Sequence, residues 1–204
     1  MKRLILSIVL VVAFGGKYSF CQSYQYGLEI SPSFDFQLQT ASNNTWSTVS
    51  GNGFLLGVFF DKRLNEHTFL GTGAKFEYIG FIQKQGDFVV NSFQIGSLNI
   101  PLTFKQEIGI TENWFYSAGV GLNYNFLNGQ RVFGNWVNLN DIVNQWQPYV
   151  NVGINYLMDN HFEIGMHARY HFLDLWSQTY QITTQTKTKL FSFDFSIRYT
   201  LASH

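Results

Sequence analysis

Apolar and polar residues alternate with a period of two along most of this chain. Around residue 120, for example, Tyr116, Ala118, Val120 and Leu122 are separated by Ser, Gly and Gly. Because successive side chains of a β-strand point to opposite faces, this alternation predicts strands with one apolar and one polar face. Eight runs show the pattern, and they cover residues 28–38, 54–61, 70–78, 97–105, 114–126, 150–156, 162–172 and 191–199.

The connections between these runs alternate in length. If each strand is antiparallel to the next, the long connections share one rim, and the short ones share the other rim with both termini. The long ones are centred on residues 40–52, 83–91, 127–146 and 173–188, and the short ones on 61–67, 108–112 and 158–160. This layout is typical of outer-membrane barrels. We therefore predict an all-β fold, an eight-stranded antiparallel up-and-down transmembrane β-barrel.

A low content of charge indicates which face meets the surroundings. Charged residues make up 13% of the chain, whereas a water-facing surface needs about 25–35%. We therefore expect the apolar faces to contact lipid, with girdles formed by Tyr26, Tyr78, Trp114, Tyr124, Tyr156, Tyr170 and Tyr199. A soluble secreted ligand-binding barrel, with its cavity lined by the aromatic faces, stays open as an alternative.

The N-terminus has the layout of a secretory signal. Lys2 and Arg3 precede an apolar run at 4–14, and a small-x-small site ends at Cys21. We predict a signal peptide at 1–21 and an outer-membrane barrel domain at 22–204, with both termini periplasmic. Acylation of Cys21 is a minor alternative. The 13 basic and 13 acidic residues balance, so no nucleic-acid partner is expected.

The polar faces carry ionisable residues that would lie inside the barrel. We interpret them as a structural, ion-paired filling of a polar lumen. A proton or ion path, or a catalytic cluster, is the alternative. The set consists of Glu29, Asp35, Lys75, Glu77, Lys105, Glu107, Glu163, His167, Arg169, His171, Asp194 and Arg198.

Enzymatic and metal-binding sites are only weakly signalled. His171, Asp174 and Ser177 could form the catalytic group of a lipid-modifying enzyme, but neither a G-x-S-x-G nor an H-E-x-x-H motif occurs. Of His161, His167 and His171, only the last two share a strand face, so a third ligand is lacking. We therefore expect a non-enzymatic protein without metal or cofactor.

Six aromatic residues fall in the long connections. They could contact partners outside the cell, or they could extend the outer girdle, and both interpretations stay open. These residues are Trp46, Phe88, Phe133, Trp136, Trp146 and Trp176.

Four short segments, in order along the chain, resemble the PorT-like outer-membrane β-barrel family of Bacteroidota. Residues 97–105 (SLNIPLTFK) are similar to its L-x-I-P-L-x-x-K strand, and 114–121 (WFYSAGVG), 152–156 (VGINY) and 168–170 (ARY) resemble the next three strands. Within the first segment, Pro101 lacks an N–H and predicts a bulge or a locally broken ladder. The founding branch of this family is linked to secretion, a role not carried over to this chain on strand motifs alone, so association with envelope or secretion proteins is a hypothesis about this barrel. The resemblance itself implies a location in the outer-membrane bilayer. It implies no single activity.

Overall fold

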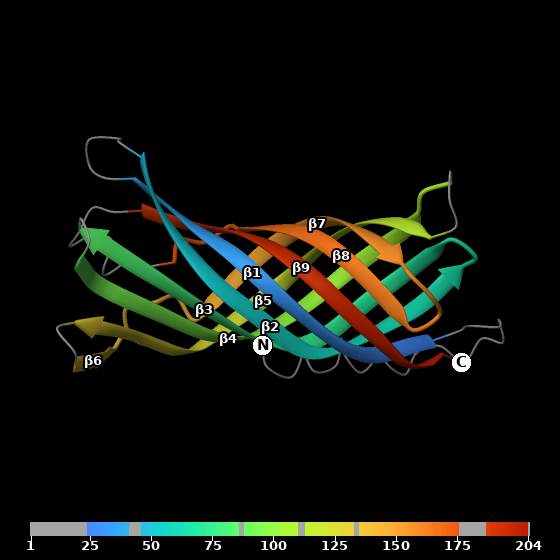
Figure 1. Ribbon diagram of the computed structural model, residues 1–204, viewed down its shortest axis with the longest axis horizontal. Coiled ribbons are helices and arrows are strands. Elements are labelled where there is room, and N and C mark those ends of the chain that lie inside the picture. The colour runs from blue at the N-terminus through green and yellow to red at the C-terminus, as the bar shows by residue number, and fades with distance from the viewer. Residues whose placement is uncertain are drawn as a thin grey trace, which may run out of the picture.

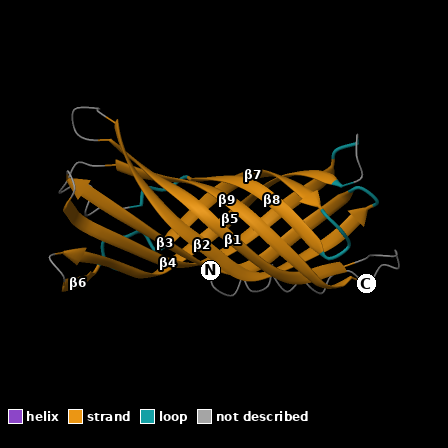
Figure 2. Cartoon of the chain, in the orientation of Figure 1, coloured by secondary structure: helices purple, strands orange, loops and turns teal. Residues whose placement is uncertain are grey.

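The structure, a computed structural model, is a cylinder of tilted β-strands (Figure 1, Figure 2). It describes residues 24–40, 46–85, 88–109, 113–132, 135–175 and 187–203. The predicted signal peptide lies outside these residues. The strands are β1 (Tyr24–Thr40), β2 (Trp46–Asn65), β3 (Thr68–Gln85), β4 (Phe88–Glu107), β5 (Trp114–Val132), β6 (Asn135–Asn138), β7 (Trp146–Leu157), β8 (Phe162–His171) and β9 (Lys187–Ser203).

Eight antiparallel strands close the wall, which confirms the predicted fold. Neighbours in sequence pair around the cylinder, β5 pairs with both β4 and β7, and the wall closes where β1 pairs with β9. Leu28 lies opposite Tyr199 at this closing seam. The ninth strand, β6, is a short hairpin partner of β5 alone and is not part of the wall. Within the described residues, no helix is long and apolar enough to cross a membrane.

The two rims of the barrel differ. At one, here called the turn rim, short connections join β2 to β3 and β7 to β8, and Tyr24 and Ser203 lie at this end (Figure 1). At the other, the outer rim, much of the chain expected as loop is strand: β1 ends at Thr40, and β3 and β4 leave only residues 86–87 between them. Pairing into tall hairpins satisfies backbone hydrogen bonds that loops would leave to water.

Two prolines interrupt ladders without shifting the register. The β3–β4 ladder is broken opposite Pro101 and resumes unchanged at Asn99. Thr72 Oγ1 donates to the Pro101 carbonyl at 2.8 Å within this gap. The β1–β9 ladder is interrupted in the same way at Pro32. The prediction of a locally broken ladder at Pro101 is therefore confirmed, and no bulge is needed there.

The outer face of the wall is an apolar belt. Leu28, Leu56 and Val152 are 49%, 53% and 58% exposed although they lie in mid-strand. Aromatic pairs lie at both edges of the belt. Trp114 contacts Tyr156 near the turn rim. Tyr78 contacts Phe54, and Tyr124 contacts Trp146, nearer the outer rim. Such an apolar exterior is unsuitable for water and matches lipid, so the soluble-barrel alternative is wrong.

The interior is polar for only part of its length. Near the outer rim, lumen-facing side chains of β3, β4 and β9 pack with three residues of the connections after β6 and β8. We call this group the apolar cap, and it consists of Ile79, Phe81, Phe93, Ile95, Leu139, Val143, Leu175 and Leu190. The predicted polar filling therefore describes only the part of the lumen on the turn-rim side of the cap.

Candidate functional site in the barrel lumen

Small residues on the polar faces leave space for large side chains inside the barrel. A Cβ atom at Gly121 would lie 2.2 Å from the Tyr149 ring, and one at Gly153 would lie 2.4 Å from the His167 ring. Tyr149 is 2% exposed and its hydroxyl donates to Asn99 Oδ1 at 3.0 Å. The glycines that alternate with apolar residues therefore make room for the lumen contents.

A first group of charges, here called the rim cluster, fills the lumen toward the turn rim. Its members are Glu29, Asp61, Lys75, Lys105, Glu163 and Arg198. Lys105 Nζ lies 2.8 Å from Asp61 and 2.9 Å from Glu163, and Arg198 Nη1 lies 3.0 Å from both carboxylates. Glu29 extends the network, because Lys75 Nζ lies 2.5 Å and Arg198 Nε 3.4 Å from its oxygens. Three carboxylates therefore face three cations, which balances the charge of this buried group.

A second group, the central cluster, is built around Arg169. Arg169 Nε lies 2.5 Å from Asp194, and its Nη2 lies 2.5 Å from Glu77 and 2.9 Å from Asp194. Ser97 and Asn123 also donate to Glu77. These charge-assisted hydrogen bonds hold the guanidinium between carboxylates of β3 and β9, so the cluster ties opposite parts of the wall together.

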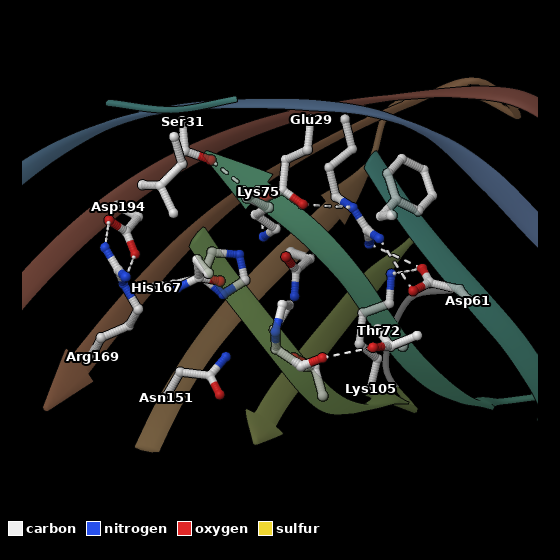
Figure 3. Close-up of a pocket in the computed structure, with 18 of the residues that line it drawn as sticks. Glu29, Ser31, Asp61, Thr72, Lys75, Lys105, Asn151, His167, Arg169 and Asp194 are labelled. Atoms are coloured by element: carbon white, nitrogen blue, oxygen red, sulfur yellow. Dashed lines mark hydrogen bonds and ion pairs between the residues drawn. The ribbon is translucent and has the colours of Figure 1, made fainter. Parts of the chain in front are cut away.

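Between the clusters the lumen retains a polar cavity of about 60 Å³ (Figure 3). Lys75, His167 and Arg169 line it together with Asn151. A cavity of this size holds a few water molecules and no larger solute. The lumen on the turn-rim side of the apolar cap is therefore filled by side chains with a small hydrated space among them.

Most of the predicted lumen residues line the interior. Glu29, Asp35, Lys105, Arg169 and Arg198 are among those that are nearly inaccessible. The remainder of the interior group consists of Lys75, Glu77, Glu163, His167, His171 and Asp194, of which Lys75 and His167 are half-buried.

Glu107 and Asp61 are the two departures from the predicted set. Glu107 lies at the turn rim, where its Oε2 is 2.6 Å from Nδ1 of the exposed His67, and it joins neither cluster. Asp61, which the prediction left out, is 2% exposed and bridges Lys105 and Arg198. Its position two residues after Phe59 on the lumen face was the signal that could have revealed it.

The three histidines considered as metal ligands have different surroundings. His167 Nε2 lies 3.2 Å from Ser196 Oγ. His171 is fully buried beside the Tyr149 ring, with 5.3 Å between centroids, and neither of its ring nitrogens makes a hydrogen bond within the described residues. His161 lies at the turn rim, where its Nδ1 is 3.1 Å from the Thr200 carbonyl. No group of three potential ligands occurs among the residues that the structure covers.

Two of the three residues suggested for lipid modification, His171 and Asp174, can be placed in the structure. His171 points into the lumen, away from the lipid-facing side, and hydrogen-bonds to no carboxylate in the described part of the chain. Asp174 Oδ1 instead lies 3.2 Å from Lys189 Nζ. Ser177 lies outside the described residues. Within the described residues, His171 and Asp174 are therefore not hydrogen-bonded to each other.

Two of the six loop aromatics have side chains that can be placed. Trp136 is 56% exposed on β6 and lies over Gly129. Trp146 is 53% exposed, and its ring centroid is 4.6 Å from that of Tyr124, so it continues the aromatic girdle. Phe133 and Trp176 lie outside the described residues, and for Trp46 and Phe88 the structure describes the backbone alone.

Two solved structures are similar to this chain. A structure of Neisserial surface protein A matches with a TM-score of 0.51 and 13% identity, over 85% of this chain and 96% of that chain. Ail, the attachment invasion locus protein of Yersinia pestis, matches with a TM-score of 0.46 and 14% identity, over 86% and 99%. The first likeness concerns the fold alone. No curated protein matches the chain.

A family model matches nearly the whole chain. The model for the outer membrane protein beta-barrel domain matches residues 20–202, which include every described strand except the last residue of β9. The closed wall, the apolar belt and the sealed charges are what a barrel in a bilayer requires. This chain belongs to the outer membrane protein beta-barrel domain family, and it is an integral protein of the outer membrane.

Proposed function

We propose that this protein is a non-enzymatic, PorT-like barrel that serves as a membrane-embedded contact platform for envelope or secretion proteins. The observation that carries this proposal is the double closure of the lumen. The rim and central clusters occupy the part that crosses the membrane, and the apolar cap fills the outer end. A barrel with a filled lumen can act through contacts on its surface but not by conducting solutes.

The length of the strands at the outer rim supports a role of their hairpins in partner contact. The strands β1 to β5 have 17 to 20 residues each, although about 9–11 tilted residues cross a bilayer. The outer end of β5 pairs with β6, whose exposed side chains include Asn135 and Val137. In the proposed orientation, these hairpins are extracellular and both termini are periplasmic.

The orientation is tested by cysteine labelling on intact cells. Asn135→Cys is expected to react with a membrane-impermeant maleimide, whereas Asn160→Cys in the β7–β8 turn reacts only after the outer membrane is permeabilised. Both residues are exposed, so the two sites form a matched pair. Labelling of Asn160→Cys alone on intact cells would reverse the proposed orientation.

Partner contact is tested by placing a photo-crosslinking amino acid at Val137, with Met158 at the turn rim as the matched control. Both side chains are exposed, at 46% and 60%. We expect a discrete adduct with an envelope or secretion protein at Val137. Adducts with lipid alone at both positions would contradict the platform. Turnover of phospholipid or lipid A by the purified barrel would contradict the non-enzymatic assignment.

A further inference from the structure

A groove lies on the outer wall where the β5–β6 hairpin leaves the barrel. Its volume is about 300 Å³, and its lining comes from β3, β4, β5, β6 and the residues that follow β6. The register between β4 and β5 shifts here, since Gly96 faces Leu127 and Ser97 faces Asn125. The extra residue, Phe126, forms a bulge, which bends a strand and redirects its side chains.

One side of the groove belongs to the lipid-facing belt. Phe126 contacts Phe76, with 6.1 Å between ring centroids, and Tyr78 contacts Phe54 at 5.8 Å. Leu127 is 57% exposed beside Gly96, where a Cβ atom would lie 3.0 Å from the Leu127 side chain. This side therefore continues the surface that acyl chains cover.

The other side of the groove is neutral and polar. Trp136 lies over Gly129, where a Cβ atom would be 3.2 Å from its ring, and more than half of the Trp136 surface stays exposed. Gln94, Asn138 and Asn140 supply amide groups beside it. None of the lining residues carries a charge, so the site does not favour an anionic or cationic ligand.

One buried acceptor in the lining has no partner. Asn128 is 5% exposed, and its Nδ2 donates to Asn140 Oδ1 at 3.0 Å. Its Oδ1 accepts no hydrogen bond within the described residues. A buried acceptor without a donor costs free energy. Asn128 lines the groove, so a ligand hydroxyl that reaches this oxygen would satisfy it.

We propose that this groove binds the neutral sugar headgroup of an outer-leaflet glycolipid. A flat aromatic ring beside several amide groups suits a sugar, because the ring covers its C–H face while the amides bond its hydroxyls. The adjoining belt of Phe126 and Leu127 then contacts the acyl chains. A ligand that joins both parts in one molecule matches a groove that straddles the edge of the membrane.

The test uses the full barrel in nanodiscs of phosphatidylcholine that contain equal mole fractions of monoglucosyl diacylglycerol and phosphatidylglycerol. Native mass spectrometry then counts the lipids that stay bound. We expect the glucolipid to be retained in preference to phosphatidylglycerol by about tenfold. Trp136→Ala should reduce this preference at least about threefold, and Asn128→Leu about two- to tenfold.

Trp114→Ala is the matched control, because Trp114 is 43% exposed in the girdle at the opposite rim. It should leave the preference unchanged. A gel shift between unheated and boiled samples verifies that each variant is folded. Equal retention of both lipids, or an equal loss in Trp114→Ala and Trp136→Ala, would overturn the proposal. Full competition by free methyl glucoside would overturn the assignment to a lipid-linked sugar.

Discussion

Replacing Arg169 with methionine tests whether the central cluster stabilises the barrel. Arg169 is 4% exposed, and its guanidinium donates three charge-assisted hydrogen bonds to Glu77 and Asp194. The Arg169→Met variant leaves two buried carboxylates without their cation. Because breaking a buried ion pair strands a charge, the free energy of unfolding should fall by about 3–5 kcal/mol. Urea unfolding of the barrel in lipid vesicles, followed by tryptophan fluorescence, measures this change.

A neutral replacement of the whole group separates a stranded charge from lost packing. The triple variant Glu77→Gln, Arg169→Met and Asp194→Asn removes all three charges, so it should recover most of the lost stability. Lys189→Met is the control, because the Lys189 side chain is 28% exposed in its ion pair with Asp174, and its loss should cost about 0–1 kcal/mol. An Arg169→Met variant as stable as this control, or a triple variant less stable than Arg169→Met, would refute the reasoning.

Three further predictions concern packing, pH and conduction. Gly121→Val should lower the free energy of unfolding by about 1–3 kcal/mol, because its Cβ would overlap the Tyr149 ring, whereas Gly80→Val, with no atom nearer than 3.8 Å to its Cβ, should change it little. The backbone N–H groups of residues 161 and 162 lower the pKa of Asp159 from its ordinary 3.8. The turn should therefore be stabilised above that value and lose the contribution as pH falls through the folded pKa, and Asp159→Asn should remove this dependence in acid unfolding. In planar bilayers the barrel should carry no steady current, and a stable conductance would contradict the doubly closed lumen.

The strands and their facing could be predicted because lipid and a narrow lumen demand unlike side chains on opposite faces. Alternation therefore survives in all eight wall strands. Alternation does not show which residues face the lumen where both faces of a strand are apolar. Asp61 was left out because Leu55 and Phe59 on the same lumen face make that run less regular. Near the outer rim, Ile79 and Phe81 occupy alternate positions that face the lumen, as the strand period requires. Their side chains are apolar, however, whereas the pattern predicts polar residues on that face.

The connections were harder to predict, because length and polarity do not distinguish a loop from a tall hairpin. Residues 127–146 were expected as one loop, yet β5 runs to Val132 and β6 pairs back onto it. The apolar cap depends on contacts between Leu139 or Leu175 and strands far away in the sequence. The outer groove depends on the extra residue Phe126, which no local pattern marks.

The unequal strand lengths make the outer end of the barrel one-sided. Strands β2 and β4 have 20 residues and β8 has 10, which at about 3.3 Å per residue and about 40° of tilt corresponds to a difference of about 25 Å in height. A neighbour that diffuses in the plane of the membrane meets a wall whose strands are long at β1 to β5 and short at β7 and β8. The rotation of the molecule about the membrane normal therefore decides which lateral encounters bring surfaces together above the lipid.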